Sequence, residues 1–297
     1  MKRITYLLGP MRLPFLVLTP ACIFLGLGSA LWTSGSIDIL YFMLTLIGAV
    51  SAHISVNSLN EYFDFKSGLD FKTIRTPFSG GSGTLPAHPG SAPTALATGL
   101  TTFAITGLVG LYFLSVRGWG LLPLGLLGLI SIVLYTPWIT RSSFFCLITP
   151  GLGFGPFMVM GTDFVLTGSY SWTAFIASLI PFFLVSNLLL LNQFPDTAAD
   201  KSTGRWHLPI AVGRKKSALV YGLFLLMTYL SIAAGISFGH FPWFCMLGMA
   251  SLVIAVPAAL GALRYAENME KLKIYMTLNV VLNIVTPVLV AIGFLVG

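Results

Sequence analysis

Two stretches of the chain repeat one order of residue types, and those types bind metal ions and phosphate. In each stretch an asparagine precedes an aspartate by four positions, and a Lys-Ser pair follows closely, at Lys66-Ser67 and Lys201-Ser202. The matched ends of the two stretches are 132 positions apart. A repeat of this kind often places a binding site where the two halves of a membrane protein meet.

The oxygen-bearing side chains of both stretches predict a site for a hard cation. Mg²⁺ typically takes one or two carboxylates and keeps water and phosphate oxygens as its other ligands. Solvated loop acids are the simpler alternative, but the repeat favours metal binding. We expect the metal ligands to be Asn60, Asp64, Asp70, Asn192, Asp196 and Asp200.

Basic residues surround both stretches and predict that the ligand of the metal is a phosphate compound. Carboxylates that hold magnesium, close to Lys and Arg that hold phosphate oxygens, are typical of a diphosphate site. Each cation could instead be a determinant of membrane topology. The expected diphosphate ligands are Arg12, Lys66, Lys72, Arg75, Arg141, Lys201 and Arg205.

Helical spacing places these polar residues on common faces, because positions four apart lie on one side of a helix. One face carries His53, Asn57, Asn60 and Asp64. We expect His53 and Asn57 either to contact a second substrate or to hydrogen-bond neighbouring helices. Pro195 should kink or end the helix that carries the second stretch.

The composition indicates that a membrane positions these motifs. The 297 residues are 56% hydrophobic and only 8% charged, which excludes an ordinary soluble globule. The net charge of +7 does not predict nucleic-acid binding, because the basic residues lie in short gaps between apolar segments. The sequence therefore predicts a polytopic membrane protein with one domain over residues 1–297, the lipid bilayer as its surroundings, and no obligate protein partner.

Nine apolar segments are long enough to cross the hydrocarbon core, which requires about 20 residues of helix. They are residues 13–32, 37–63, 92–116, 119–138, 144–166, 171–193, 218–238, 241–263 and 272–296. With the N-terminus inside, every basic residue except Arg117 falls on the inner side, as is typical of cytoplasmic loops. We expect the N-terminus and both acidic stretches to be cytoplasmic and the C-terminus to lie outside.

The motifs resemble those of the UbiA superfamily of intramembrane prenyltransferases. The first aspartate-rich motif of that family is matched by Asn60, Asp64 and Asp70, and the second by Asn192, Asp196, Asp200 and Lys201. The resemblance extends through Tyr135-Thr136-Pro137, Phe154-Gly155-Pro156 and residues 204–209, and it covers most of the chain.

The spacing within the first motif is most similar to the dihydroxynaphthoate polyprenyltransferases of menaquinone synthesis. The 4-hydroxybenzoate enzymes more often place an acid where this chain has Gly68. Two positions depart from the family pattern. Glu61 replaces an aspartate, and Trp206-His207 stands where related sequences tend to have a basic residue and Thr.

This resemblance implies an all-α fold of nine transmembrane helices, closed at the cytoplasmic end by two aspartate-rich loops, in a bacterial or archaeal cell membrane. It implies that Mg²⁺ bridges the carboxylates to an isoprenyl diphosphate, that Tyr135 joins the diphosphate ligands, and that Asp64, Asp196, Asp200 and Lys201 are catalytic. An aromatic acceptor, best represented by 1,4-dihydroxy-2-naphthoate, would capture the allylic cation.

Three other functions stay open from the sequence. The acceptor could be another small aromatic such as 4-hydroxybenzoate, or the cation could be captured within its own chain, as in UbiA-type terpene cyclases. A cation-coupled transporter also uses carboxylates within a membrane. The glycine-rich segment 79–83 is either a flexible connector or a phosphate-binding loop.

Overall fold

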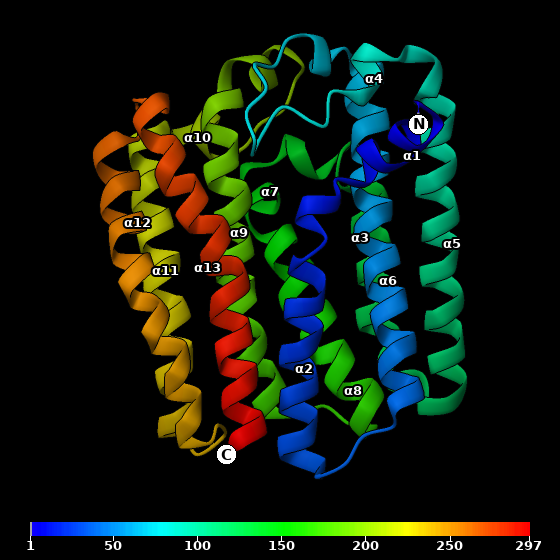
Figure 1. The fold of residues 1–297 in the computed structure, drawn as a ribbon, viewed down its shortest axis with the longest axis vertical. Helices are drawn as coiled ribbons and strands as arrows, with labels where there is room; N and C mark the ends of the chain where they lie inside the picture. The colour runs from blue at the N-terminus through cyan, green and yellow to red at the C-terminus, as the bar shows by residue number, and fades with distance from the viewer. Residues whose placement is uncertain (1) are drawn as a thin grey trace.

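The computed structural model describes residues 2–297, and it describes the side chains of all of these except residues 2–5 and 7. The basic side chains of Lys2 and Arg3, which belong to the expected inner charge, therefore lie outside the described side chains. Over the described range the chain consists of helices and loops without a β-strand. The long helices run side by side, and the two termini lie at opposite ends of the bundle (Figure 1).

Thirteen α-helices make up most of the fold. They are α1 Lys2–Met11, α2 Leu18–Ser34, α3 Ile39–Ser67, α4 Thr84–Ala87, α5 Ala92–Arg117, α6 Leu122–Leu134, α7 Ser143–Leu152, α8 Gly161–Thr167, α9 Trp172–Ser202, α10 Leu208–Val212, α11 Arg214–Ser237, α12 Leu252–Tyr265 and α13 Met269–Val296. Tighter 3₁₀ segments are η1 Leu13–Phe15, η2 Leu69–Phe71, η3 Pro89–Ser91, η4 Trp119–Leu121, η5 Ile139–Arg141 and η7 Trp243–Ser251, and Gly153–Met160 forms a wider π-helix, η6.

Seven helices of the described chain are long and apolar enough to cross a membrane. An eighth crossing is formed if the pair Leu8–Phe15 and Leu18–Ser34, bent by 52°, is one span. The predicted segment 119–138 is shorter than expected, because its apolar helix covers only Trp119–Leu134. Each of the nine predicted segments is thus helical, but only seven reach the full length unaided.

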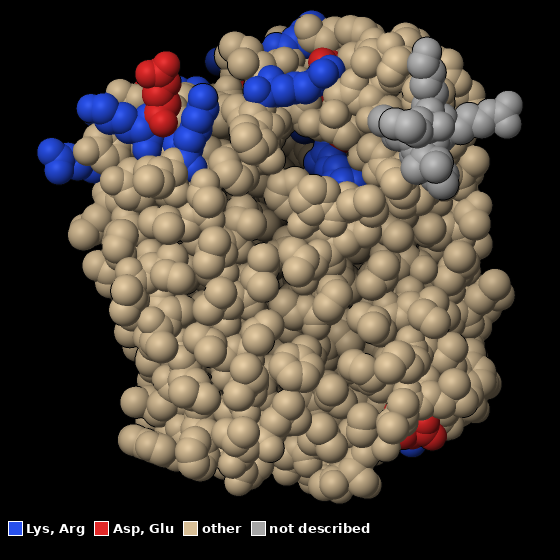
Figure 2. All heavy atoms as spheres, viewed as in Figure 1, with Lys and Arg blue, Asp and Glu red and all other residues tan. Residues whose placement is uncertain are grey.

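The surface of the bundle is that of a protein that lies in lipid. Large apolar side chains face outward along its sides, among them Val253, which is 80% exposed, and Leu108, which is 66% exposed. Figure 2 shows the charged side chains gathered at the two ends, with an uncharged band between them. A soluble protein rarely exposes so continuous an apolar surface.

The helices that carry the two acidic stretches are longer than their apolar segments. The aspartate-rich loops that the resemblance implies are wrong for Asp64, Asp196 and Asp200, because α3 continues to Ser67 and α9 to Ser202. For Asp64 the helical spacing predicted this position. Polar residues extend both helices beyond the hydrocarbon length, and α9 runs through Pro195 instead of ending there. Gly68 ends α3 in a left-handed conformation, with φ of 77°, that favours glycine. A rigid helix therefore positions each of these three carboxylates.

The packed core and the open part of the bundle lie on different sides. Fully buried apolar side chains of α2, α9, α11 and α13 form one continuous core, which includes Leu25, Leu184, Ile232 and Leu282. Helix α6, by contrast, has no buried residue along its length. A cavity occupies the space between α3, α5, α6, η6 and α9.

Candidate active site

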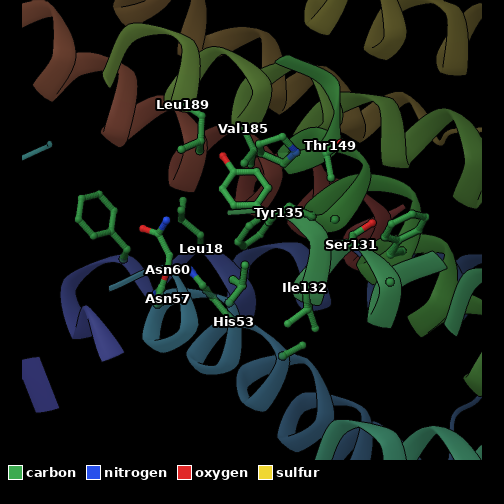
Figure 3. Close-up of a pocket in the computed structure, with 18 of the residues that line it drawn as sticks. Leu18, His53, Asn57, Asn60, Ser131, Ile132, Tyr135, Thr149, Val185 and Leu189 are labelled. Atoms are coloured by element: carbon green, nitrogen blue, oxygen red, sulfur yellow. The ribbon is translucent and has the colours of Figure 1, made fainter. Parts of the chain in front are cut away.

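The cavity has a volume of about 410 Å³ and joins a polar end to an apolar arm. Eleven of the residues predicted from the sequence to form the site line this cavity: Arg12, His53, Asn57, Asn60, Asp64, Asp70, Tyr135, Asn192, Asp196, Asp200 and Arg205. Figure 3 shows His53, Asn57 and Asn60 projecting from α3 into the space that Tyr135 enters from the end of α6, with Val185 and Leu189 of α9 opposite. The two stretches separated by 132 residues thus face one cavity.

Arg205 joins the two acidic stretches. Its guanidinium donates to the carboxylate of Asp64 on α3 and, at 3.1 Å, to Oδ1 of Asp200 on α9. Burial alone would lower the pKa of Arg205, but the Asp64 and Asp200 carboxylates outweigh it and raise that pKa. Arg205 is therefore a permanent positive charge between two buried acids.

His207 completes the surroundings of Asp200. Its Nε2 lies 3.0 Å from Asp200 Oδ2, and both residues are buried. His207, one of the two residues that depart from the family pattern, thus contacts the second aspartate-rich stretch directly. No role for His207 could be predicted from the sequence, where the only signal was the departure of Trp206-His207 from the family pattern.

Glu61 is fully buried and connects three parts of the chain. Its Oε1 accepts from Arg12 Nε at 2.7 Å and from the backbone N–H of Ser82 at 2.7 Å, and its Oε2 accepts from Ser82 Oγ at 2.7 Å. Arg12 stands at the break between α1 and α2, where its φ of 53° is left-handed, and it also donates to Asn60 Oδ1 at 3.1 Å. Glu61 therefore fixes both the break and the glycine-rich segment.

The glycine-rich segment 79–83 lies against the carboxylates. A Cβ at Gly81, where φ is 73°, would be 3.1 Å from Glu61 Oε1 and 3.2 Å from Asp70 Oδ1. A side chain at this position would therefore crowd two acids in a strained backbone conformation. Ser79, Gly80 and Gly81 all line the cavity. The segment is an anchored wall of the site and not a free connector.

The donor atoms of the polar end suit a hard cation. Buried oxygens that receive no hydrogen bond from the described residues include Asp70 Oδ2, Asn192 Oδ1 and Asp196 Oδ1, and all three residues line the cavity. Within the described chain no three His, Cys, Asp or Glu side chains gather closely enough to hold one ion by themselves. Mg²⁺ commonly uses only one or two carboxylates together with substrate phosphates, so these residues fit that ion.

Asp70 has an altered affinity for protons. Its pKa is raised to about 7, chiefly by burial and in addition by the neighbouring Glu61 and Asp64 carboxylates, against the opposing effect of Arg12 and Arg205. Asp70 follows the end of α3, in the 3₁₀ turn η2, and is only 6% exposed. A nearby cation would favour its ionised form.

Five of the predicted diphosphate ligands lie at the rim and do not line the cavity. Lys72 donates to Ser202 Oγ at 3.3 Å, and Lys66 lies over the ring of Tyr62 at 5.8 Å. The five exposed cations are Lys66, Lys72, Arg75, Arg141 and Lys201. Lys201 follows Asp200 on α9, so the helix turns it away from the face that carries Asp196 and Asp200.

The two residues expected near a second substrate lie beside the polar end. His53 is buried, and its Nδ1 is 2.8 Å from Thr19 Oγ1. Its ring packs edge-to-face against that of Phe154, with 4.8 Å between the ring centroids. Asn57 Nδ2 donates to Met11 O at 3.0 Å. Both line the cavity. Both residues thus contact neighbouring segments, as one of the two alternatives predicts, and their contact with a second substrate stays a prediction.

Residues 20–281 match the UbiA prenyltransferase family. This range carries the motifs and the helices that surround the cavity. The chain belongs to the UbiA family. Together with the apolar helices, this membership makes it an integral membrane protein.

Comparison with known UbiA proteins supports the branch and the fold. The chain is 28% identical over 210 residues to the 1,4-dihydroxy-2-naphthoate octaprenyltransferase of Bacillus subtilis, with 70% of this chain and 66% of that enzyme's length covered. The resemblance to the dihydroxynaphthoate branch is thereby confirmed.

Two solved structures share the fold at low identity. A digeranylgeranylglyceryl phosphate synthase aligns over 100% of both chains with a TM-score of 0.65 and 16% identity. A UbiA homologue of Archaeoglobus fulgidus bound to DMAPP and Mg²⁺ aligns over 94% of this chain and 97% of its own, with a TM-score of 0.59 and 13% identity. The UbiA fold therefore extends over the whole described bundle.

Proposed function

We propose that this protein transfers an isoprenyl group from a polyprenyl diphosphate to a small aromatic acceptor, with 1,4-dihydroxy-2-naphthoate as the best candidate. The observation that carries the proposal is a single cavity whose charged end meets an apolar arm. An isoprenyl diphosphate has the same division between a charged head and an apolar chain. The naphthoate enzyme of Bacillus subtilis, to which the chain is similar, supports the choice of acceptor.

The metal-binding role is divided between the two stretches. Asp64 and Asp70, with Asn60, would hold Mg²⁺ on one side, and Asp196 and Asp200, with Asn192, on the other. The unpaired oxygens of Asp70, Asn192 and Asp196 support this assignment, as does the Mg²⁺ bound to the Archaeoglobus homologue. When bound, Mg²⁺ neutralises charge on the diphosphate and makes it a better leaving group.

The chain's own residues bind and orient the diphosphate. Arg12 and Arg205 present guanidinium groups at the cavity's polar end, and Tyr135 adds a hydroxyl there. When the allylic C–O bond breaks, its electron pair goes to the diphosphate, and these fixed cations stabilise the negative charge that develops. The five exposed cations act at the rim, where they attract the anionic donor. They also favour an orientation of the protein in which this end lies on the cytoplasmic side.

The apolar walls protect the cation that remains. Phe154 and Phe157 of η6 line the cavity and can stabilise a carbocation through their ring faces while water is excluded. An electron-rich carbon of the acceptor then bonds to the allylic carbon, and the acceptor loses a proton. We assign His53 and Asn57 to the acceptor side because they line the cavity next to the polar end.

The proposed topology has nine crossings in one domain, residues 1–297, with the N-terminus and active site cytoplasmic and the C-terminus outside. The termini lie at opposite ends of the bundle (Figure 1), which requires an odd number of crossings. Seven full-length spans, the bent pair and the short helix Trp119–Leu134 together make that number. The excess of basic residues beside the acidic stretches supports the orientation.

A membrane assay tests the proposed function directly. Membranes containing the protein are supplied with isoprenyl diphosphates and a panel of aromatic acceptors, including 4-hydroxybenzoate, with and without Mg²⁺. We expect a prenylated naphthoate and Mg²⁺-dependent diphosphate release, both nearly abolished in Asp64→Ala and Asp196→Ala. Full activity in both variants contradicts the assignment, and a cyclic hydrocarbon formed from the diphosphate alone identifies a cyclase instead.

A further inference from the structure

The glycines of the membrane helices differ in what a side chain at each position would meet. Small residues in such helices usually allow two backbones to approach closely. Gly151 and Gly155 do so here, because a Cβ would lie 2.2 Å from Phe182 O and 2.4 Å from Ser178 O respectively. These glycines permit contact between helices, and a side chain at either position would push the helices apart.

Four other glycines line the cavity with open space where a Cβ would lie, and three of them surround the apolar arm. The fourth, Gly153, precedes Phe154, whose ring contacts His53 beside the polar end. Gly110 of α5, Gly125 of α6 and Gly161 of α8 line the cavity, and a Cβ at any of them would meet no heavy atom within 4 Å. Close packing does not explain these glycines. Their missing side chains leave room inside the cavity.

The three glycines of the arm lie at the end of the cavity away from the carboxylates. Gly110 lies one turn along α5 from Thr106, whose hydroxyl donates to Gly48 O on α3. Near the same level, Phe113 and Leu121 also line the arm and belong to a small apolar cluster with Phe164 and Val165. The arm thus continues past the middle of the membrane helices.

The length of the arm follows from α3, which lines the apolar part of the cavity from Thr45 up to Asn60, where the head-group end begins. At a rise of 1.5 Å per residue this part of the helix is roughly 22 Å long. An isoprene unit contributes four main-chain bonds of about 1.5 Å, so that it extends over roughly 5 Å. The arm is therefore long enough for at least four units, and its end is where the three glycines lie.

We propose that Gly110, Gly125 and Gly161 set the length of isoprenoid chain that the protein accepts, and that its donor has four or more isoprene units. This inference rests on the proposed function, because it names the donor of that reaction. Asp70 Oδ2, which is buried and unpaired at the other end of the same cavity, is available where the diphosphate head would lie. Shortening the arm should then exclude long chains and leave the head group's site intact.

Leucine at Gly110 or Gly125 tests the proposal. Leucine has a higher helix propensity than glycine, so neither change weakens its helix. With donors of two or three units, we expect kcat/KM of Gly110→Leu and Gly125→Leu to stay within about threefold of wild type. With donors of four or more units, we expect a loss of roughly tenfold or more, since the new side chain occupies the arm.

Gly107→Leu is the matched control on α5. A Cβ at Gly107 also meets no heavy atom within 4 Å, but this residue does not line the cavity. Its activity should be unchanged for every donor. Gly110→Ala, a smaller change, should show a weaker form of the same chain-length dependence if Gly110→Leu fails to fold.

Binding of each donor to the full-length protein in Mg²⁺, without an acceptor, separates this inference from the proposed function. If wild type binds the donors but transfers to no acceptor, the proposed function fails, and the chain-length dependence is read from binding. An equal loss for short and long donors in the leucine variants, or undiminished use of long donors, overturns the inference.

Discussion

The guanidinium of Arg205 is hydrogen-bonded to the Asp64 carboxylate, although 141 positions separate the two residues. The same guanidinium reaches Asp200, so one side chain from the loop after α9 joins both acidic stretches. Without a bound metal ion, the positive charge of Arg205 offsets the repulsion between the two buried carboxylates. When diphosphate and metal bind, the arginine can exchange one carboxylate for a phosphate oxygen.

Replacing Arg205 should therefore affect catalysis and stability together. Arg205→Gln leaves two buried carboxylates without their cation, and removing one partner of a buried pair commonly costs about 3–5 kcal/mol. We expect kcat/KM for the donor to fall by roughly a hundredfold or more and thermal stability in detergent to decrease. Arg141→Gln changes an exposed cation that the sequence also predicted as a ligand, and it should alter activity by less than about threefold. Equal effects of the two variants would contradict the distinction between cavity and rim.

Glu61 should act as a positioning residue for the glycine-rich segment. Glu61→Gln weakens the charged bonds to Arg12 and Ser82, so we expect KM for the donor to rise by about tenfold while kcat changes less. Ser82→Ala should shift KM in the same direction, because it removes the hydroxyl that bonds Oε2. Ser115→Ala is the control, since that hydroxyl bonds only within its own helix. A fall in kcat at constant KM would indicate instead that Glu61 takes part in the chemical step.

The raised pKa of Asp70 predicts how stability depends on pH in the metal-free protein. Its pKa of about 7 in the folded chain exceeds the value of 3.8 expected for the unfolded chain. The folded state therefore binds the extra proton between these values, and stability falls as pH rises through this window, by at most about 4 kcal/mol. Melting in detergent should thus occur at a lower temperature at pH 8 than at pH 5.5. Asp70→Asn should flatten this difference, and an unchanged pH dependence in that variant would show that other groups cause it.

His53 should affect the acceptor more than the donor. His53→Ala removes a ring that lines the cavity beside Asn57, so we expect KM for the naphthoate to rise by roughly tenfold while KM for the diphosphate stays within about twofold. His240→Ala provides a comparison, because His240 lies in the connection between α11 and η7 and not at the cavity. Steady-state kinetics with each substrate varied in turn makes the measurement. A matching rise in both constants would place His53 in a purely structural role.

Helical periodicity was enough to predict one side of the site. His53, Asn57, Asn60 and Asp64 repeat at intervals of three or four, and α3 brings all four to the cavity. The boundary between the predicted segments 92–116 and 119–138 was also correct, because α5 ends at Arg117. Residue spacing within one helix is enough to predict which side chains share a face and where the helix ends.

Contacts between distant segments could not be read in this way. Lys201 and Arg205 are both basic and both lie close after Asp200, but only Arg205 reaches the cavity. Lys201 is still part of α9, whereas the helix has ended at Ser202 before Arg205. The left-handed backbone of Arg12 is equally hidden, because this conformation is rare outside glycine. The role of Glu61 depends on where the segment 79–83 packs in the fold, and helical periodicity does not predict that position. These features arise from tertiary packing.

The apolar arm, enclosed by helices that themselves lie in lipid, also determines how the reaction must be measured. A donor that fills it dissolves in the bilayer and not in water, so the quantity that governs its binding is its mole fraction among the lipids. Adding inert phospholipid at a fixed total amount of donor should therefore slow the reaction, although nothing in the aqueous phase has changed. The rate in a cell then depends on the composition of the membrane as well as on the amount of donor.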